Sequence, residues 1–242
     1  MMTRPVCAIV GAGEGLGHSL AAKFASNGCD VSLISRSQQG SESAVRAATE
    51  AGATVNFFTG DAAQPETIEQ ALAKTVTDMG QIEVLIYNVR GDFERCEPLD
   101  ITYEELEDVF RVEVAGALAA SKAVLPAMRE RGSGTMLFSS ATAALRGSAI
   151  YPLYAIGKFG LRALTQSLTK AYSKDGVHIV HVRLDCDLDM PMMREMYGDQ
   201  YDPEKLANTD DVAETYWWVH QQPRSAWSNE IELRPYTETW TC

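Results

Sequence analysis

Basic residues are scarce in this chain of 242 residues, in which 21 lysines and arginines stand against 33 acidic residues and leave a formal net charge of −12. Nucleic acids and anionic membranes attract basic surfaces, so this balance argues against either of them as the main partner. An acidic surface that keeps the protein soluble is the simpler interpretation. It still allows a local cationic pocket for a single phosphate.

Cysteines are odd in number and scattered, and they form neither a CxxC pair nor a disulfide framework. Long apolar runs are also missing: Val6 to Val10 follows the first residues directly and is too short to span a bilayer or to act as a secretory signal. We therefore expect a protein of the reducing cytoplasm. The five cysteines are Cys7, Cys29, Cys96, Cys186 and Cys242.

Linkers, repeats and low-complexity tracts are absent too, which predicts a single domain over residues 1–242. Short runs rich in Val, Ile and Phe alternate with Ala- and Leu-rich helical segments, which predicts right-handed βαβ units. The expected fold class is α/β, with a Rossmann-type, doubly wound parallel sheet in three α/β/α layers. The expected strands are Val6 to Val10, Val31 to Ile34, Val55 to Phe58, Val84 to Tyr87, Met136 to Phe138 and Val177 to Leu184. The expected helices are Leu16 to Ser26, Glu42 to Ala51, Pro65 to Met79, Tyr103 to Met128 and Tyr154 to Tyr172.

The stretch at about 190–209 breaks this alternation. It carries Met192, Met193, Met196, Tyr197 and Tyr201 among polar residues. An apolar insertion after the C-terminal end of a strand is well placed to cover a ligand. We expect a substrate-covering insertion here, with an ordinary surface helix as the alternative.

The first expected strand ends in a glycine-rich loop, and a helix follows directly. Glycines permit a tight turn and the close approach of a pyrophosphate, while the helix N-terminus supplies N–H groups and a positive dipole end. This strand–loop–helix context predicts a dinucleotide site rather than a purely structural turn. The candidate binding residues of the loop are Gly11, Gly13, Glu14, Gly15, Leu16 and Gly17.

The second expected strand is followed by neutral Ser35 and by Arg36. An acidic residue there would bind the ribose 2′-hydroxyl and repel a 2′-phosphate, whereas an arginine can pair with that phosphate. NADP(H) is therefore favoured over NAD(H), although Glu14 adds a negative charge to the loop and a solvated Arg36 is the alternative. Asp61 and Ala62, after the third strand, are candidates for the adenine site, but Asp61 could equally cap a turn.

Tyr154 and Lys158 are four residues apart at the start of an expected helix and so share one face. A nearby ammonium favours the phenolate, so we expect Lys158 to lower the pKa of Tyr154 from about 10 toward a range useful for proton transfer. The YxxxK pattern alone also occurs by chance in many chains.

In order and spacing, these motifs resemble the short-chain dehydrogenases/reductases over nearly the whole chain: the glycine loop, Asp61, Asn88 after the fourth strand, and Tyr154 with Lys158. The resemblance implies an Asn-Ser-Tyr-Lys tetrad that moves hydride between a nicotinamide and a carbonyl or alcohol. It implies that Tyr154 is the general acid/base, that Lys158 binds the nicotinamide ribose and tunes the tyrosine, and that Asn88 contacts the cofactor. It also implies a homodimer or homotetramer, formed through the two longest expected helices.

Two catalytic positions of that family differ here. The family serine falls on Ala141, so either Ser140 or Thr142 supplies the hydroxyl, or the hydroxyl is absent. Loss of one preorganised donor costs a factor on the order of 10²–10³ in rate. The family asparagine falls on Glu113, which either pairs with the lysine and weakens its effect on the tyrosine, or acts as a proton-relay base, or is a buried structural carboxylate.

Two cofactor-contact positions differ as well. The family glycine that lets the cofactor ribose come close is replaced by Arg90, which either narrows the cleft or reaches a ligand anion. Asp185 and Cys186 replace a Pro-Gly turn, and Met190 replaces a threonine that binds the nicotinamide. Backbone contacts can persist there, but the threonine hydroxyl is lost.

No metal site is expected. The alternating Asp185, Asp187 and Asp189 lack the central glycine and the distal glutamate of a calcium loop. His178 and His181 lie in one strand at an odd separation, so their side chains should point to opposite faces of the sheet.

These patterns favour an NADP(H)-dependent oxidoreductase that interconverts a small carbonyl and a secondary alcohol. The candidate catalytic residues are Tyr154, Lys158, Ser140 and Glu113. The altered positions leave two alternatives. One is a catalytically impaired dinucleotide-binding protein, acting as a sensor or as an inactive partner; the other is elimination or isomerisation, with Glu113 or Tyr154 as the base.

Overall fold

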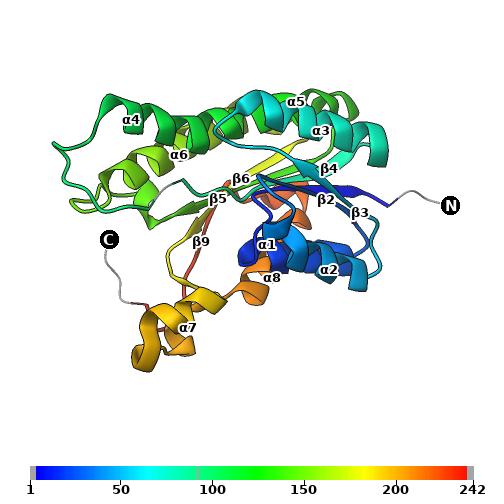
Figure 1. Ribbon diagram of the computed structural model, residues 1–242. Helices are drawn as coiled ribbons and strands as arrows, with labels where there is room; N and C mark the ends of the chain where they lie inside the picture. The colour runs from blue at the N-terminus through cyan, green and yellow to red at the C-terminus, as the bar shows by residue number, and fades with distance from the viewer. Residues whose placement is uncertain (1–3, 92, 239–242) are drawn as a thin grey trace.

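The computed structural model describes residues 4–91 and 93–238. Within them, parallel strands form one seven-stranded sheet in the order β3-β2-β1-β4-β5-β6-β9, with helices on both faces (Figure 1). This arrangement confirms the predicted Rossmann-type, doubly wound fold in three layers. The predicted strands correspond to β1 (Val6–Val10), β2 (Asp30–Ser35), β3 (Val55–Thr59), β4 (Ile82–Tyr87), β5 (Thr135–Ala141) and β6 (His178–Leu184).

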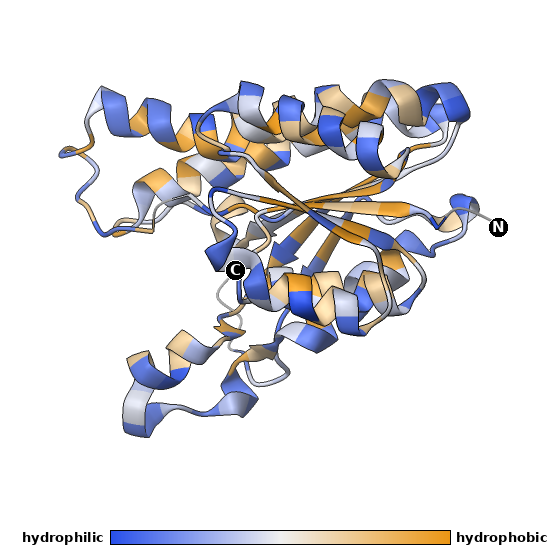
Figure 2. Ribbon diagram, turned by 45° about the vertical axis from the view of Figure 1, so that its right-hand side comes forward, coloured by the Kyte–Doolittle hydropathy of each residue, from blue (hydrophilic) through white to orange (hydrophobic). Residues whose placement is uncertain are grey.

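Two helical layers bury the sheet from both sides, and the apolar strands run between helices whose outer faces are polar (Figure 2). Side chains of β1 therefore alternate between two cores: Val6, Ala8 and Val10 pack into one, while Cys7 and Ile9 pack into the other. Such double burial explains why this strand is an unbroken apolar run. One layer contains α3 (Pro65–Met79), α4 (Tyr103–Phe110), α5 (Gly116–Arg131) and α6 (Pro152–Tyr172); the other contains α1 (Leu16–Ser26), α2 (Glu42–Glu50) and α8 (Thr209–His220).

The single helix expected at 103–128 is in fact two helices. Thr102 and Glu105 form a capping box that starts α4, and a π-helical turn at Arg111–Ala115 separates α4 from α5. A π-turn holds one more residue than an α-helical turn, so it changes which side chains face inward. The turn carries Glu113 into the interior.

Strand β9 (Glu230–Leu233) and helix α8 were not predicted. β9 is an edge strand in which carboxylates alternate with apolar residues, so it lacks the hydropathy of the central strands. The acidic side chains have basic partners: Glu230 binds Arg162 of α6 at 2.8 Å, and Glu232 contacts Arg183 of β6. These partners are distant in sequence, and the pairing is therefore invisible in the local pattern.

The insertion at 190–209 lies outside the two helical layers and extends away from the sheet (Figure 1). Two short strands, β7 (Leu188–Asp189) and β8 (Ala207–Asn208), form its base, and α7 (Pro191–Tyr197) lies between them. The Tyr197 hydroxyl donates to Asp187 at 2.6 Å, which ties α7 to the residues before β7.

Among the residues that the structure describes, no helix combines the length and apolarity needed to cross a bilayer. The four described cysteines are free thiols, and Cys242 lies outside the described residues.

Buried histidines predict an acid-sensitive fold. Burial lowers the pKa of His181 in β6 to about 4 and that of His220 in α8 to about 4, whereas unfolded histidine titrates near ~6.5. Between roughly pH 4 and pH 6.5, these histidines bind more protons in the unfolded chain than in the folded protein. The free energy of unfolding therefore falls as the pH drops from about 6.5 to about 4. We expect a loss of a few kcal/mol, roughly, across this window.

Urea denaturation at a series of pH values measures this effect. In His181→Gln the slope of the unfolding free energy against pH should be smaller than in the wild type, because one of the buried histidines with a lowered pKa is gone. A wild-type free energy of unfolding that stays flat across the window would contradict the prediction.

Candidate active site

A cavity opens at the carboxyl ends of the strands, beside the point where the strand order reverses between β1 and β4. Ligands of open α/β sheets bind at such a switch point. Eight of the predicted site residues line this cavity together with Lys158: Gly11, Gly13, Gly15, Leu16, Gly17, Asn88, Ser140 and Tyr154. The other predicted residues lie outside its lining: Glu14, Ser35, Arg36, Asp61, Ala62 and Glu113.

The glycine loop has the form of a cradle. Gly11 has a φ of +88°, and a Cβ there would lie 2.5 Å from the Asn88 carbonyl oxygen. A Cβ at Gly17 would lie 2.9 Å from Ala12 Cα, whereas one at Gly13 would meet only open space. Close packing thus requires glycine at positions 11 and 17. The open space at Gly13 fits the approach of a phosphate group. The residues present fit a dinucleotide.

Contacts around the loop fix its position. The Asn88 side-chain amide donates to the Gly11 carbonyl at 3.1 Å and so ties the loop to the end of β4. The Asp61 carboxylate accepts the Ala63 N–H at 3.0 Å, which is the turn-capping role considered for it. Ser35 donates to the Ser37 carbonyl at 2.8 Å.

Two other predicted residues, Arg36 and Glu14, are exposed at the surface. Met190, in the place of the family threonine, lies against Gly15, so the insertion reaches the loop.

Tyr154 lies in the first turns of α6, with Lys158 one turn later on the same face. The Lys158 Nζ is 5.6 Å from the centroid of the Tyr154 ring. Lys158 does lower the pKa of Tyr154, as expected, but burial has a larger effect in the other direction. The net result is a pKa above 10, so the predicted downward shift is wrong in sign.

Glu113 is fully buried and forms an ion pair with Lys158, with 2.8 Å between Oε2 and Nζ. The pairing considered from sequence is therefore the arrangement present. Both carboxylate oxygens are occupied, because Oε1 accepts the Gly91 N–H at 2.8 Å. Each oxygen thus has one donor among the described residues, as expected of a carboxylate that holds the lysine in place.

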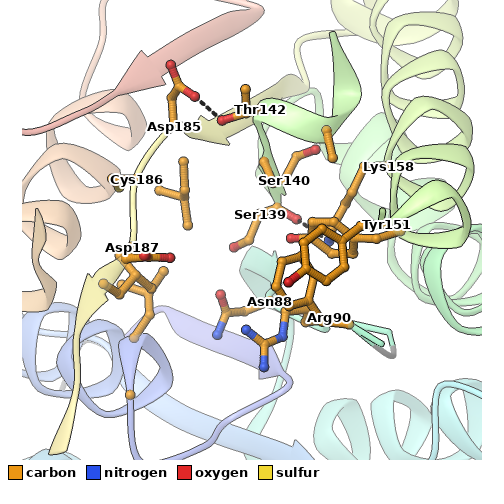
Figure 3. Close-up of a pocket in the computed structure, with 18 of the residues that line it drawn as sticks. Asn88, Arg90, Ser139, Ser140, Thr142, Tyr151, Lys158, Asp185, Cys186 and Asp187 are labelled. Carbon is orange, nitrogen blue, oxygen red and sulfur yellow. Dashed lines mark hydrogen bonds between the residues drawn. The ribbon is translucent and has the colours of Figure 1, made fainter. Parts of the chain in front are cut away.

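The hydroxyls at the end of β5 have different surroundings. Thr142 donates to the Asp185 carboxylate, which also binds Arg234. Ser140 Oγ is buried and has no hydrogen-bond partner within the described part of the chain. Figure 3 shows Thr142 turned toward Asp185 and Ser140 nearer to Lys158. Ser140 is therefore the hydroxyl that remains available to a ligand.

An aromatic cluster beside Tyr154 was not found from the sequence. Phe93 and Tyr151 stack with ring centroids 4.1 Å apart, and Phe93 and Tyr154 form a T-shaped pair with ring centroids 4.9 Å apart. The Arg90 guanidinium lies over the Phe93 ring, 5.8 Å from its centroid. In the sequence, the only sign of this cluster was Tyr151, which lies one turn before Tyr154. Phe93 comes from a distant loop and gave none.

The aspartates discounted as metal ligands have other partners. Asp187 accepts from Tyr197 and Asp189 accepts from Tyr201 at 2.8 Å. Over residues 4–91 and 93–238, His, Cys, Asp and Glu side chains form no group that could hold a metal ion.

A Rossmann sheet, an open glycine loop and a tyrosine–lysine pair at one cavity define a dehydrogenase-like class of protein. The model of the short chain dehydrogenase family matches residues 5–195, and the chain belongs to this family. It is an oxidoreductase of the short-chain dehydrogenase type.

Similar proteins span nearly the whole chain. An uncharacterized oxidoreductase of Staphylococcus saprophyticus is 27% identical over 231 residues, which cover 95% of this chain and 97% of the relative. The crystal structure of a short-chain dehydrogenase from Rhodopseudomonas palustris matches with a TM-score of 0.82 at 28% identity and covers 96% of this chain and 99% of that one. L-Sorbose reductase from Gluconobacter frateurii, complexed with NADPH and L-sorbose, matches with a TM-score of 0.84 over 97% of this chain and 96% of that one. At 19% identity this last likeness shows the fold alone.

Proposed function

We propose that the protein is an NADP(H)-dependent oxidoreductase that interconverts a small carbonyl compound and a secondary alcohol. The observation that carries this proposal is the meeting of Ser140, Tyr154 and the glycine loop at one cavity. Ser140 offers a hydroxyl without a partner among the described residues, and Tyr154 offers a phenol. The NADPH in the L-sorbose reductase structure, a protein of the same fold, gives further support.

Each residue has a distinct task in this proposal. Backbone amides of the glycine loop hold the pyrophosphate at the N-terminus of α1. The bound reduced nicotinamide supplies a hydride to the carbonyl carbon. Ser140 donates a hydrogen bond to the carbonyl oxygen, and Tyr154 gives that oxygen its proton before regaining one from solvent. Asn88 and Asp61 contribute to cofactor binding.

Arg36 is proposed to pair with the 2′-phosphate of NADP(H). Arg36→Ala should raise KM for NADPH by roughly 10- to 100-fold, because a hydrogen bond to a charged group contributes about 1.5–3 kcal/mol. KM for NADH should not change, since NADH lacks this phosphate. Arg46→Ala, which removes another exposed arginine from nearby α2, is the matched control. Equal effects on both cofactors would show that Arg36 is merely solvated.

A dinucleotide-binding sensor is the second candidate. The ion pair with Glu113 favours it, because that pair engages the lysine that the family uses at the nicotinamide ribose. Titration with NADPH, followed by cofactor fluorescence, and a panel of carbonyl compounds separate the two functions. Tight NADPH binding without turnover of any compound would favour the sensor.

We further propose that the protein acts in the cytoplasm as a homodimer or homotetramer. Phe110, Leu118 and Phe159 are exposed on α4, α5 and α6, which lie together in one layer (Figure 1). Apolar side chains gathered on neighbouring helices suit a helix-to-helix interface. The free thiols suit a reducing compartment.

A further inference from the structure

Each N–H donor of the Lys158 ammonium has an acceptor within the protein. The ammonium has three N–H donors, and it finds three acceptors: Glu113 Oε2 at 2.8 Å, the Val89 carbonyl at 3.3 Å and the Ser139 carbonyl at 3.4 Å. The lysine side chain is only 3% exposed and the glutamate side chain 0%. A ribose hydroxyl could reach this ammonium only by replacing one of the two longer carbonyl contacts.

The surrounding segments are shaped to receive Glu113. A Cβ at Gly157 would lie 2.8 Å from Glu113 Cγ, so only glycine lets α6 approach the carboxylate this closely. The π-helical turn places the residue inward, and the buried Tyr87 hydroxyl donates to the Val112 carbonyl of the same turn at 2.5 Å. π-Turns of this kind are frequent at functional sites.

The charged groups that act on Tyr154 come from four segments. Lys158 on α6 and Arg90 after β4 both favour the phenolate, while Glu113 in the π-turn and Asp187 after β6 disfavour it. Burial disfavours it most, and the pKa of Tyr154 is raised. Because Glu113 contacts the lysine directly, its charge opposes that of Lys158.

We propose that Glu113 is a positioning residue that fixes the Lys158 ammonium and opposes its charge beside Tyr154, which favours Tyr154 as a proton donor and so favours carbonyl reduction. This inference rests on the proposed function and states which direction of the reaction the site favours. In reduction, the carbonyl carbon gains a hydride with its two electrons, the nicotinamide is oxidised, and the Tyr154 proton goes to the oxygen. In alcohol oxidation the tyrosine must first lose its proton, so only the small phenolate fraction is active.

A charge cycle at the two positions tests the proposal. In Glu113→Gln the lysine charge is unopposed, so the titration of Tyr154 should move down by roughly one pH unit, a size typical of a close charge. At pH 7 alcohol oxidation should then become faster by up to about tenfold. In Lys158→Met the titration of Tyr154 should move to higher pH. In the double variant Glu113→Gln/Lys158→Met, which keeps neither charge, Tyr154 should titrate close to its wild-type pH.

NMR of protein labelled with ¹³Cζ-tyrosine follows this titration directly, and the Tyr154 signal is assigned by its absence in Tyr154→Phe. Glu230→Gln is the matched control, because it breaks the Arg162 ion pair of the same helix but is not among the groups that act on Tyr154. The proposal fails if Glu113→Gln leaves the titration in place or moves it up. If that variant does not fold, equal titrations in Lys158→Met and the double variant overturn the proposal. Because NMR needs no turnover, a protein without oxidoreductase activity would refute the proposed function while still testing this inference.

Discussion

Replacing Tyr154 by phenylalanine should lower kcat for carbonyl reduction by a factor of roughly 10²–10⁴, the usual contribution of a positioned proton donor. The phenyl ring keeps the edge contact with Phe93, so the change removes only the hydroxyl. NADPH binding, measured by fluorescence titration, should be nearly unchanged, because the glycine loop and Arg36 do not touch this hydroxyl. Single-turnover rates with saturating NADPH measure the effect on the chemical step.

Tyr151→Phe is the matched control for this variant. Tyr151 lines the same cavity one turn earlier, and the described contacts of its side chain are ring contacts with Phe93 and Arg95 that need no hydroxyl. It should retain most of the wild-type rate. If Tyr154→Phe turned over as fast as the wild type, Tyr154 would have no part in the proton transfer.

The parts of the fold that were predictable are those fixed by local pattern. Strand β1 is buried on both faces and therefore reads as an apolar run, and the loop after it is rich in glycine because backbone and ligand must approach closely. The π-turn at Arg111–Ala115 could not be predicted in the same way. Its geometry depends on Gly157 and on the Tyr87 hydroxyl, which belong to other elements.

The site shows the same division between local and distant contacts. The four-residue spacing of Tyr154 and Lys158 predicts that they share a helix face, and they do. The direction of the tyrosine pKa shift was wrong, because it is decided mainly by burial among segments far away in the sequence. The choice between Ser140 and Thr142 likewise required knowing that Asp185 engages the threonine.

Replacing Ser140 by alanine should lower kcat by a factor on the order of 10²–10³, the cost of losing one preorganised donor to a developing oxyanion. Side chains alternate along β5, so Ser139 points to the opposite face, where its hydroxyl bonds with that of Tyr216 at 2.8 Å. Ser139→Ala makes the same chemical change one residue away and should affect stability rather than kcat. Thr142→Val removes the bond to Asp185 and should also leave kcat within about threefold, because that hydroxyl is already engaged. A larger loss in Thr142→Val than in Ser140→Ala would assign the catalytic hydroxyl to the threonine, and it would mean that substrate binding breaks the contact with Asp185.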